Sequence, residues 1–312
     1  MAASIAYLFP GQGAQVVGMG KDLYDEFSSA RAVFQEADAA IGFSLSNLCF
    51  NGPEEELRRT INTQPAILTV SYACLRAAEE LGVLPPMDQL AFVAGHSLGE
   101  YTALAASQSL TFAEALLLVK ERGRLMDEAG NLRPGTMAAV LGMDEGPLQE
   151  VCQETGVEMA NINSPGQIVI SGDKDAIGKA MELATARGAR RVVALEVSAA
   201  FHSQLMAPAS DGIAKAVANV VFRDTKVPIV ANSTAQPVAT SAEIKDELLR
   251  QLCAPVRWQG SVEYMLAHGV TEFIEIGPGR VLTGLVKRIN GDVKTVNLSD
   301  VPSLRELQAA SG

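Results

Sequence analysis

The sequence contains little of the chemistry that metal sites and disulfide frameworks require. It has three histidines, four cysteines and one tryptophan among 312 residues. The cysteines lie far apart and show no paired spacing: Cys49, Cys74, Cys152 and Cys253. We therefore expect reduced thiols rather than disulfides, and neither a metal site nor a bound cofactor.

A basic surface and a membrane-spanning run are also absent. The 25 lysines and arginines against 36 aspartates and glutamates give a net charge of −11. A protein with this negative charge is not expected to bind nucleic acids or anionic membranes. No apolar run is long enough to cross a bilayer. The N-terminus enters a strand-like run at residues 5–9 without a basic leader. These features predict a cytoplasmic protein that binds neither nucleic acid nor membrane.

Short apolar runs that alternate with amphipathic stretches are what the sequence does contain, and they are typical of α/β proteins. The hydrophobic share of 48% is ample for a buried core. We predict strands at 5–9, 90–94, 227–232, 271–276 and 293–298. We predict helices at 18–34, from Pro53 onward, and at 65–81, 97–106, 111–129, 241–252, 261–268 and 280–289.

The middle of the chain has a different element order. It reads as strand 136–142, helix 144–155, strands 157–162 and 167–171, helix 175–187 and strand 189–197. This β-α-β-β-α-β order is the split βαβ arrangement. We therefore predict a ferredoxin-like subdomain at 131–198, entered through a linker at 130–135. It would be inserted into a larger α/β domain made of residues 1–130 and 199–312.

Ser97 is a candidate nucleophile because it lies in GHSLG (95–99), between a predicted strand and a predicted helix. This is the context of a nucleophile elbow. Gly95 and Gly99 would permit the close backbone approach that the turn needs. The N–H groups at the start of the helix could stabilise an oxyanion. A glycine-rich loop with a capping serine is the alternative interpretation.

Ser97 needs a base, and the sequence offers three candidate histidines: His96, His202 and His268. His96 adjoins Ser97, and side chains diverge at a sharp elbow, so we expect a structural role. His268 precedes a helix stop, where interaction with the helix dipole explains it. His202 follows the strand at 189–197, where loops carry catalytic groups. No acid is available to orient it, so a backbone carbonyl could do so, which gives a Ser/His dyad.

Arg122 shares one face of the helix 111–129 with Leu118, Val119, Leu125 and Met126. An arginine on an apolar stripe is rarely buried without a partner. It could form a structural ion pair, extend its head to solvent, or hold a substrate carboxylate. The third possibility would select an acyl group that carries a second carboxylate.

Seven features occur in the order of a known family: FPGQGAQ (9–15), NTQPA (62–66), GHSLGE (95–100), Arg122, NSPGQ (163–167), AFH (200–202) and EIGPG (275–279). Over essentially its whole length the chain resembles the acyltransferase family of fatty acid and polyketide synthesis. Within that family it is most similar to the malonyl-CoA:acyl-carrier-protein transacylases. The resemblance implies an α/β-hydrolase-like core with a ferredoxin-like insert, and transfer of malonyl from CoA to a carrier-protein thiol.

The resemblance also implies roles for individual residues. Ser97 would be the acylated nucleophile, His202 the base and Arg122 the malonyl-carboxylate ligand. The backbone N–H groups of Gln12 and Leu98 would form the oxyanion hole. The backbone carbonyl of Gln251 would orient the histidine, Gln64 would line the site, and Phe201 would oppose an α-methyl branch or simply pack in the core.

Two other functions stay open at this point. A serine esterase or thioesterase could use the same elbow, and it would release the acyl group to water. A catalytically silent scaffold in a synthase complex would need neither Ser97 nor Arg122. A carrier protein and CoA are both anionic, so a local basic surface is needed, for which Arg190, Arg191, Arg280, Lys287 and Arg288 are candidates.

Overall fold

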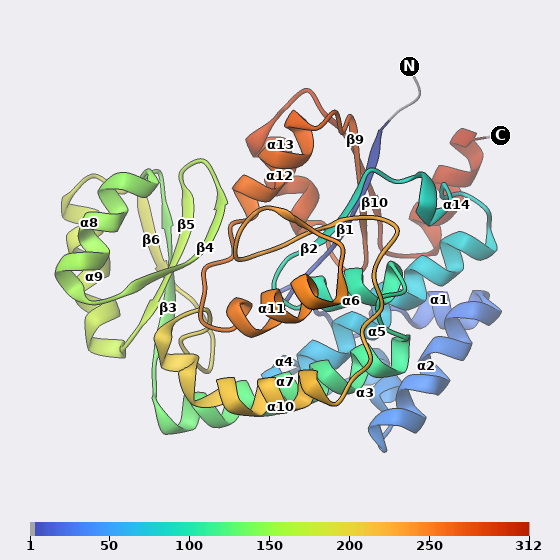
Figure 1. Ribbon diagram of the computed structural model, residues 1–312, viewed down its shortest axis with the longest axis horizontal. Coiled ribbons are helices and arrows are strands. Elements are labelled where there is room, and N and C mark those ends of the chain that lie inside the picture. The colour runs from blue at the N-terminus through green and yellow to red at the C-terminus, as the bar shows by residue number, and fades with distance from the viewer. Residues whose placement is uncertain (1–3, 312) are drawn as a thin grey trace.

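The computed structural model describes residues 4–311, which form two units that lie side by side (Figure 1). The larger unit is built on a six-stranded sheet in the order β10-β9-β1-β2-β7-β8. All neighbouring strands are parallel except β7 and β8. These strands are β1 (Ile5–Phe9), β2 (Phe92–Gly95), β7 (Ile229–Val230), β8 (Pro237–Val238), β9 (Glu272–Ile276) and β10 (Lys294–Leu298).

The large sheet is buried on both faces. In β1, Tyr7 and Phe9 join one hydrophobic cluster, whereas Ala6 and Leu8 join another on the opposite face. Two-sided burial is what a parallel sheet between helical layers requires. The cluster around Tyr7 includes α2 (Ser28–Ile41), α5 (Thr60–Glu80), α6 (Gly99–Ala106) and α7 (Phe112–Leu132). The other includes α12 (Trp258–Ala267) and α13 (Val281–Ile289).

The remaining helices of the larger unit surround these layers. They are α1 (Lys21–Glu26), α3 (Leu45–Asn51), α4 (Glu54–Arg58), α10 (Ser210–Ala218), α11 (Ser241–Gln251) and α14 (Val301–Ser311), with short 3₁₀ turns at Met87–Gln89 and Gln204–Ala209. No helix in the described part of the chain is long and apolar enough to span a membrane.

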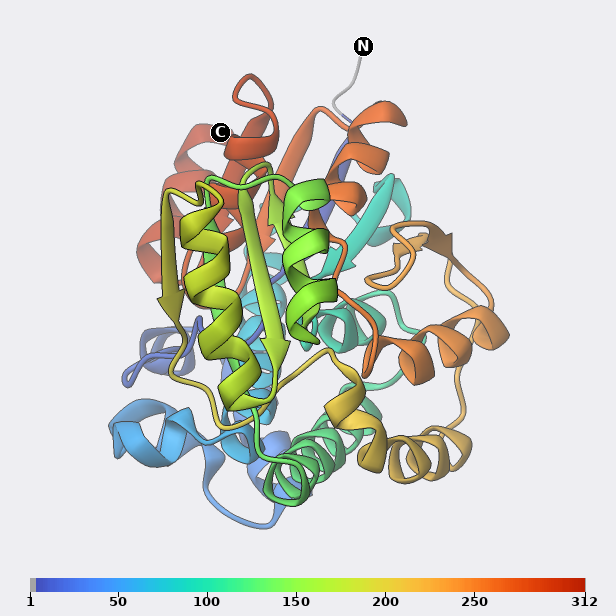
Figure 2. The same ribbon diagram turned by 90° about the vertical axis from the view of Figure 1, so that its left-hand side faces the viewer.

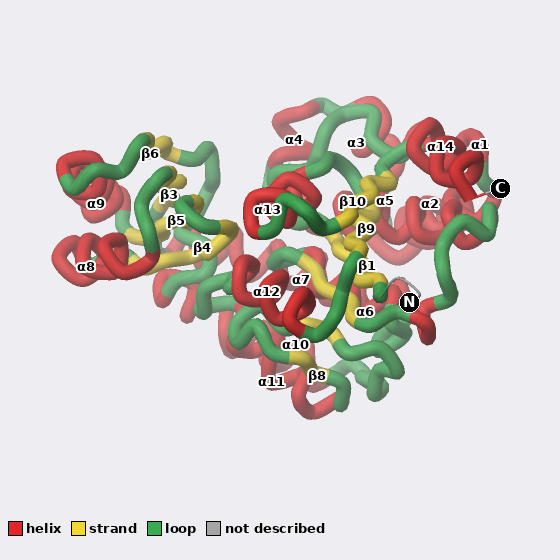
Figure 3. The backbone as a smooth tube through the Cα atoms, turned by 90° about the horizontal axis from the view of Figure 1, so that it is seen from above, coloured by secondary structure: helices red, strands yellow, loops and turns green. Residues whose placement is uncertain are grey.

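The smaller unit is an antiparallel four-stranded sheet in the order β4-β5-β3-β6. Its elements follow one another as β3 (Thr136–Leu141), α8 (Glu145–Thr155), β4 (Glu158–Ser164), β5 (Gln167–Gly172), α9 (Lys174–Ala186) and β6 (Arg191–Ala194). Helices α8 and α9 cover the outer face of the sheet (Figures 2 and 3). The inner face contributes Met137, Ala160 and Val169 to the core of the larger unit.

Backbone hydrogen bonds join the two units. The N–H of Ile162 in β4 donates to the carbonyl of Val256, and the N–H of Val256 donates to the carbonyl of Ala160, both at 2.8 Å. The chain leaves the larger unit at the end of α7 and returns through residues 195–203. Residues of the return crossing line a cavity together with His96 and Ser97, which follow the carboxyl end of β2, and ligands bind at such strand ends in α/β sheets.

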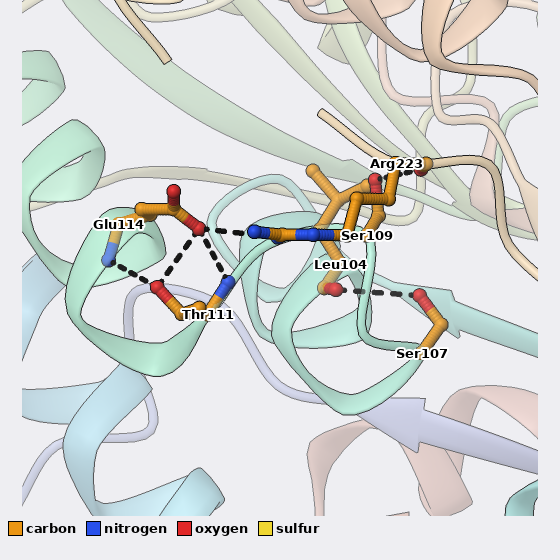
Figure 4. Close-up of polar contacts among 6 residues, drawn as sticks. All are labelled: Leu104, Ser107, Ser109, Thr111, Glu114 and Arg223. Atoms are coloured by element: carbon orange, nitrogen blue, oxygen red, sulfur yellow. Dashed lines mark hydrogen bonds and ion pairs between the residues drawn. The ribbon is translucent and has the colours of Figure 1, made fainter. Parts of the chain in front are cut away.

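Helix α7 is firmly fixed where it begins. The side chain of Thr111 accepts from the N–H of Glu114, and the Glu114 carboxylate accepts from the N–H of Thr111 at 2.7 Å, which forms a capping box (Figure 4). Arg223 contacts the same carboxylate at 3.5 Å. The hydroxyl of Ser109 donates to the carbonyl of Arg223 at 2.8 Å. These contacts set the axis of the helix that carries Arg122.

The predicted mixed α/β fold with a parallel sheet is confirmed, but several boundaries were wrong. The single helix expected at 18–34 is two helices, because Phe27 adopts an extended conformation and buries its ring in the core. Helix α5 begins at Thr60, five residues before the predicted start, and contains Pro65 in its second turn. Helix α7 extends to Leu132 into the expected linker, and β6 is shorter than 189–197. Helices α3, α10 and α14 were not predicted.

Gly99 lies where β1 and α6 approach each other closely, and a substitution there tests this packing. A Cβ at this position would lie 2.0 Å from the carbonyl oxygen of Phe9, which is backbone and cannot move aside cheaply. We expect Gly99→Ala to lower the free energy of unfolding by at least ~1–3 kcal/mol, measured by urea denaturation. Gly178→Ala in α9 is the control, since it has open space there and should stabilise by ~0.5–1 kcal/mol. Equal stability of Gly99→Ala and wild type would contradict this packing.

Candidate active site

Ser97 lies in a strained turn between β2 and α6. Its φ is 50°, in the left-handed region that non-glycine residues seldom adopt. The turn is possible because Gly95 has no Cβ, which would otherwise lie 1.9 Å from the carbonyl carbon of Gly99. The turn directs the serine hydroxyl into a cavity at the carboxyl end of β2. Strain of this kind is characteristic of functional sites.

The side chain of Asn232 stabilises this turn with two hydrogen bonds. Its Oδ1 accepts from the N–H of Ser97 at 2.6 Å, and its Nδ2 donates to the carbonyl of Gly95 at 2.7 Å. Asn232 is not among the site residues predicted from the sequence. A signal was available, because Asn232 ends the predicted strand 227–232 and polar groups at the carboxyl ends of parallel strands tend to be functional.

His202 pairs with Ser97. Its Nε2 lies 2.7 Å from Ser97 Oγ, and its Nδ1 lies 2.9 Å from the carbonyl oxygen of Gln251. A carbonyl can only accept, so the proton is on Nδ1 and the free lone pair of Nε2 faces the serine hydroxyl. Burial, and then the nearby Arg122 cation, lower the pKa of His202 to about 3. The imidazole is therefore neutral at physiological pH and can receive the serine proton.

Arg122 is buried among neutral partners. It donates to Oε1 of Gln64 at 2.7 Å, to Oε1 of Gln251 at 3.0 Å and to Oγ of Ser97 at 3.1 Å. Its guanidinium also lies over the ring of Tyr101, 5.5 Å from the centroid. Within residues 4–311 it forms no salt bridge, so of the three sequence-based possibilities the structural ion pair is not found. The side chain is only 2% exposed, which excludes a head extended into solvent.

The cavity between these groups measures about 120 Å³. Its polar end holds Ser97, Arg122 and His202, and its walls are largely apolar: Met126, Met137, Leu195, Val197 and Phe201. Four of these five wall residues come from the smaller unit or from the return crossing at residues 195–203. A volume of this size suits a short acyl group rather than a long chain.

Gln12 and Leu98, the residues predicted to form an oxyanion hole, lie close to Ser97. Both line the cavity beside Ser97, one after β1 and the other just before α6. Neither backbone N–H donates to an acceptor among residues 4–311. Two such amides next to a nucleophile can stabilise the negative oxygen of a tetrahedral intermediate.

Of the other predicted residues, Phe201 lines the cavity, whereas Gln64 and Gln251 lie behind Arg122. Gln64 is thus not among the residues that line this cavity, but it contacts the guanidinium that does. Its amide holds the guanidinium on one side and lies against the sulfur of Met126, 3.4 Å away, on the other.

The remaining histidines have distinct environments. His96 is partly buried, its Nε2 lies 2.9 Å from Oδ1 of Asn163 in β4, and it lines the cavity next to Ser97. Burial lowers the pKa of His96. His268 follows α12 with its Nδ1 2.8 Å from the carbonyl of Tyr264, and it does not line the cavity. No group of three or more histidine, cysteine, aspartate or glutamate side chains in the described chain could hold a metal ion.

Comparison with known families agrees with this geometry. The family model for the acyl transferase domain matches residues 6–305. The chain belongs to the acyl transferase domain family. This acyltransferase is 46% identical over 303 residues to the malonyl CoA-acyl carrier protein transacylase of Bacillus subtilis, covering 96% of this chain and 94% of the relative. Its identity to the Escherichia coli K12 protein of the same name is 43% over 302 residues, with 96% of each covered.

Solved structures are similar over nearly the whole acyltransferase chain. An acyl carrier protein S-malonyltransferase from Vibrio cholerae superposes with a TM-score of 0.93 at 41% identity, covering 98% of this chain and all of the other. A malonyl-transacylase solved in complex with its type II PKS acyl-carrier protein gives 0.94 at 39% identity, covering 99% and 100%.

The depressed pKa of His202 predicts how acid affects the acyltransferase. The folded protein keeps the imidazole neutral down to about pH 3, whereas the unfolded chain binds a proton below about pH 6.5. This histidine's contribution to stability is thus complete above about pH 6.5 and is lost as the pH falls toward 3. We expect the rate of serine acylation to show no fall with a midpoint near pH 6.5. An acid limb centred there would show that His202 titrates as an ordinary exposed imidazole.

Proposed function

We propose that this acyltransferase transfers the malonyl group of malonyl-CoA to the phosphopantetheine thiol of acyl carrier protein. The observation that carries the proposal is a buried guanidinium without a carboxylate partner, directed at the same cavity as an activated serine. A second carboxylate on the acyl group would supply that partner. The names of the similar proteins in Bacillus subtilis and Escherichia coli support the same substrate and acceptor.

The proposed cycle has two matched half-reactions and needs no cofactor. Ser97 attacks the thioester carbon while its proton moves to Nε2 of His202, and the oxyanion rests on the N–H groups of Gln12 and Leu98. When the C–S bond breaks, His202 returns the proton to the departing CoA thiolate. The carrier thiol then loses its proton to His202 and attacks the ester, and Ser97 recovers its proton as it leaves.

Arg122 contributes to both selection and rate in this proposal. Its positive charge, close to Ser97 and His202, lowers the pKa of the base. A malonyl carboxylate on Arg122 would neutralise that charge and make His202 a better proton acceptor. An acetyl group would leave the charge in place. Phe201, in the cavity wall, would oppose an α-methyl branch, so we propose malonyl rather than methylmalonyl as the substrate.

The fold supports a finer classification. We propose an α/β-hydrolase-like catalytic domain of residues 1–130 and 199–312, with a ferredoxin-like subdomain at 131–198. The support is the parallel sheet with a nucleophile elbow after β2, and the β-α-β-β-α-β order of the smaller unit. The free thiols, three of them buried, favour a reducing compartment, and we place the reaction in the cytoplasm.

The carrier would approach where the two units meet. Arg190, Arg191, Arg280, Lys287 and Arg288 are exposed. Arg288 of α13 bonds to the side chain of Gln167 in β5, so this helix lies against the smaller unit. The group supplies local positive charge on an acidic protein, as an anionic carrier needs. The product would serve fatty acid or polyketide synthesis.

Intact mass spectrometry after mixing with malonyl-CoA tests the proposed covalent step. We expect a malonyl adduct on the wild type and on Ser261→Ala, which removes a buried serine hydroxyl that bonds only to the carbonyl of Arg257. Ser97→Ala should form none. The adduct should persist in buffer and disappear when a carrier thiol is added. Rapid loss to water would favour a thioesterase, and no adduct on the wild type would favour a scaffold.

Arg122→Met tests carboxylate recognition while it largely fills the space of the arginine. Loss of one charge-assisted hydrogen bond is worth ~1.5–3 kcal/mol, so kcat/KM for malonyl-CoA should fall by roughly 10- to 150-fold. Loading from acetyl-CoA should not fall, because removal of the cation leaves His202 more basic. If kcat/KM falls equally for both thioesters while the melting temperature stays at the wild-type value, Arg122 does not recognise the carboxylate.

A further inference from the structure

Glu100 is the last residue of GHSLGE, lies in the first turn of α6 and is 2% exposed. The mechanism above does not use it. Its Oε1 accepts from the N–H of Asn232 at 3.0 Å, and its Oε2 accepts from Nε2 of Gln251. Both oxygens therefore face N–H donors, which is the pattern of an ionised carboxylate.

The side-chain amide of Gln251 connects this carboxylate to Arg122. Its Oε1 accepts from Nη2 of Arg122 at 3.0 Å, while its Nε2 donates to Glu100 and, at 2.9 Å, to the carbonyl of Ser97. The order is thus guanidinium, amide, carboxylate. The amide dipole has its negative end toward the cation and its positive end toward the anion.

The two charges stabilise each other across the amide. Burial, and then the neighbouring Glu247, hold the pKa of Glu100 well above its usual range, and the hydrogen bonds from Asn232 and Gln251 and the charge of Arg122 oppose that shift. Burial lowers the pKa of Arg122, and Tyr101 and Glu100 oppose that shift. A buried arginine thus has a countercharge that does not occupy the guanidinium face directed at the cavity.

We propose that Glu100 is a positioning residue for carboxylate recognition, which fixes the Gln251 amide with its oxygen on Arg122 and so holds the guanidinium toward the acyl cavity. This inference rests on the proposed malonyl transfer. It gives the glutamate of GHSLGE a part in substrate selection as well as in packing.

An isosteric change at this site should disturb that orientation. The N–H of Asn232 is backbone and cannot turn, so in Glu100→Gln the new side chain would direct its oxygen there and its NH₂ group at Nε2 of Gln251. Two donors would then face each other. A flipped Gln251 amide would place its NH₂ group on Arg122 and its oxygen on the carbonyl of Ser97, and both contacts are repulsive. Either the repelled amide shifts away from Arg122 or the flipped amide presents a donor to it, so the contact between Gln251 and the guanidinium is weakened.

The control is another buried glutamate with the same kind of hydrogen bonds. Glu275 is fully buried, and its two oxygens accept from the N–H groups of Leu282 and Thr283 at 3.0 and 2.7 Å. It contacts none of Arg122, Gln251 and Ser97. Glu275→Gln therefore reproduces the loss of a buried carboxylate at the beginning of a helix without touching the amide bridge.

The experiment measures serine acylation by malonyl-CoA and by acetyl-CoA in full-length wild type, Glu100→Gln and Glu275→Gln, with kcat and KM separated and melting temperatures recorded. We expect Glu100→Gln to lower the malonyl-to-acetyl ratio of kcat/KM by about tenfold or more. Glu275→Gln should lose stability and keep the wild-type ratio. In Arg122→Met, adding Glu100→Gln should not change the ratio further.

If Glu100→Gln fails to fold, Gln251→Met tests the same bridge, since it removes the amide and keeps the backbone carbonyl that faces His202. It should lower the ratio as well. A wild-type ratio in whichever of these variants folds overturns the inference, as does a further fall in the Arg122→Met background. A wild-type enzyme with no preference for the malonyl thioester overturns the proposed function and this inference together.

Discussion

The site depends on one constraint, which is that the charged guanidinium of Arg122 is buried away from water. Arg122 sits on an apolar helix face and reaches into a cavity whose walls are mostly hydrocarbon. Burying such a charge is expensive unless it is hydrogen-bonded and compensated. The protein supplies two neutral amides, a serine hydroxyl and an aromatic ring, and places its carboxylate one amide further away. This arrangement holds the guanidinium in place and puts no carboxylate on the guanidinium face that is directed at the cavity.

The same partners align the catalytic pair. Gln251 presents its backbone carbonyl to His202 and its side chain to Arg122 and the carbonyl of Ser97. One residue at the end of α11 therefore sets the tautomer of the base, the position of the cation and the backbone of the nucleophile. Asn232 holds the serine turn from the other side. A displacement of α11 would disturb all of these together, and substitutions in this network should not have additive effects.

Local patterns were enough to find Ser97, His202 and Arg122, because an elbow between strand and helix, a short list of histidines and an apolar stripe are all visible along the chain. Asn232, Glu100 and the side chain of Gln251 were missed because their contacts join segments more than 130 residues apart. The break at Phe27 was missed for a related reason, since only the core explains why its ring turns inward. The layered α/β fold followed from apolar runs and their alternation, and the exact helix ends did not.

Part of the cavity wall comes from a different part of the chain than the charged end. Met137, Leu195 and Val197 belong to the smaller unit and the crossing that follows it, whereas Ser97 precedes α6 and Arg122 stands on α7 of the larger one. The size of this part of the cavity and the position of the charge therefore depend on different segments. A change in the smaller unit can widen or narrow the chamber while the ionic anchor stays in place. Substitutions in the cavity walls alone could therefore let the enzyme accept other acyl groups, provided that these acyl groups keep a terminal carboxylate.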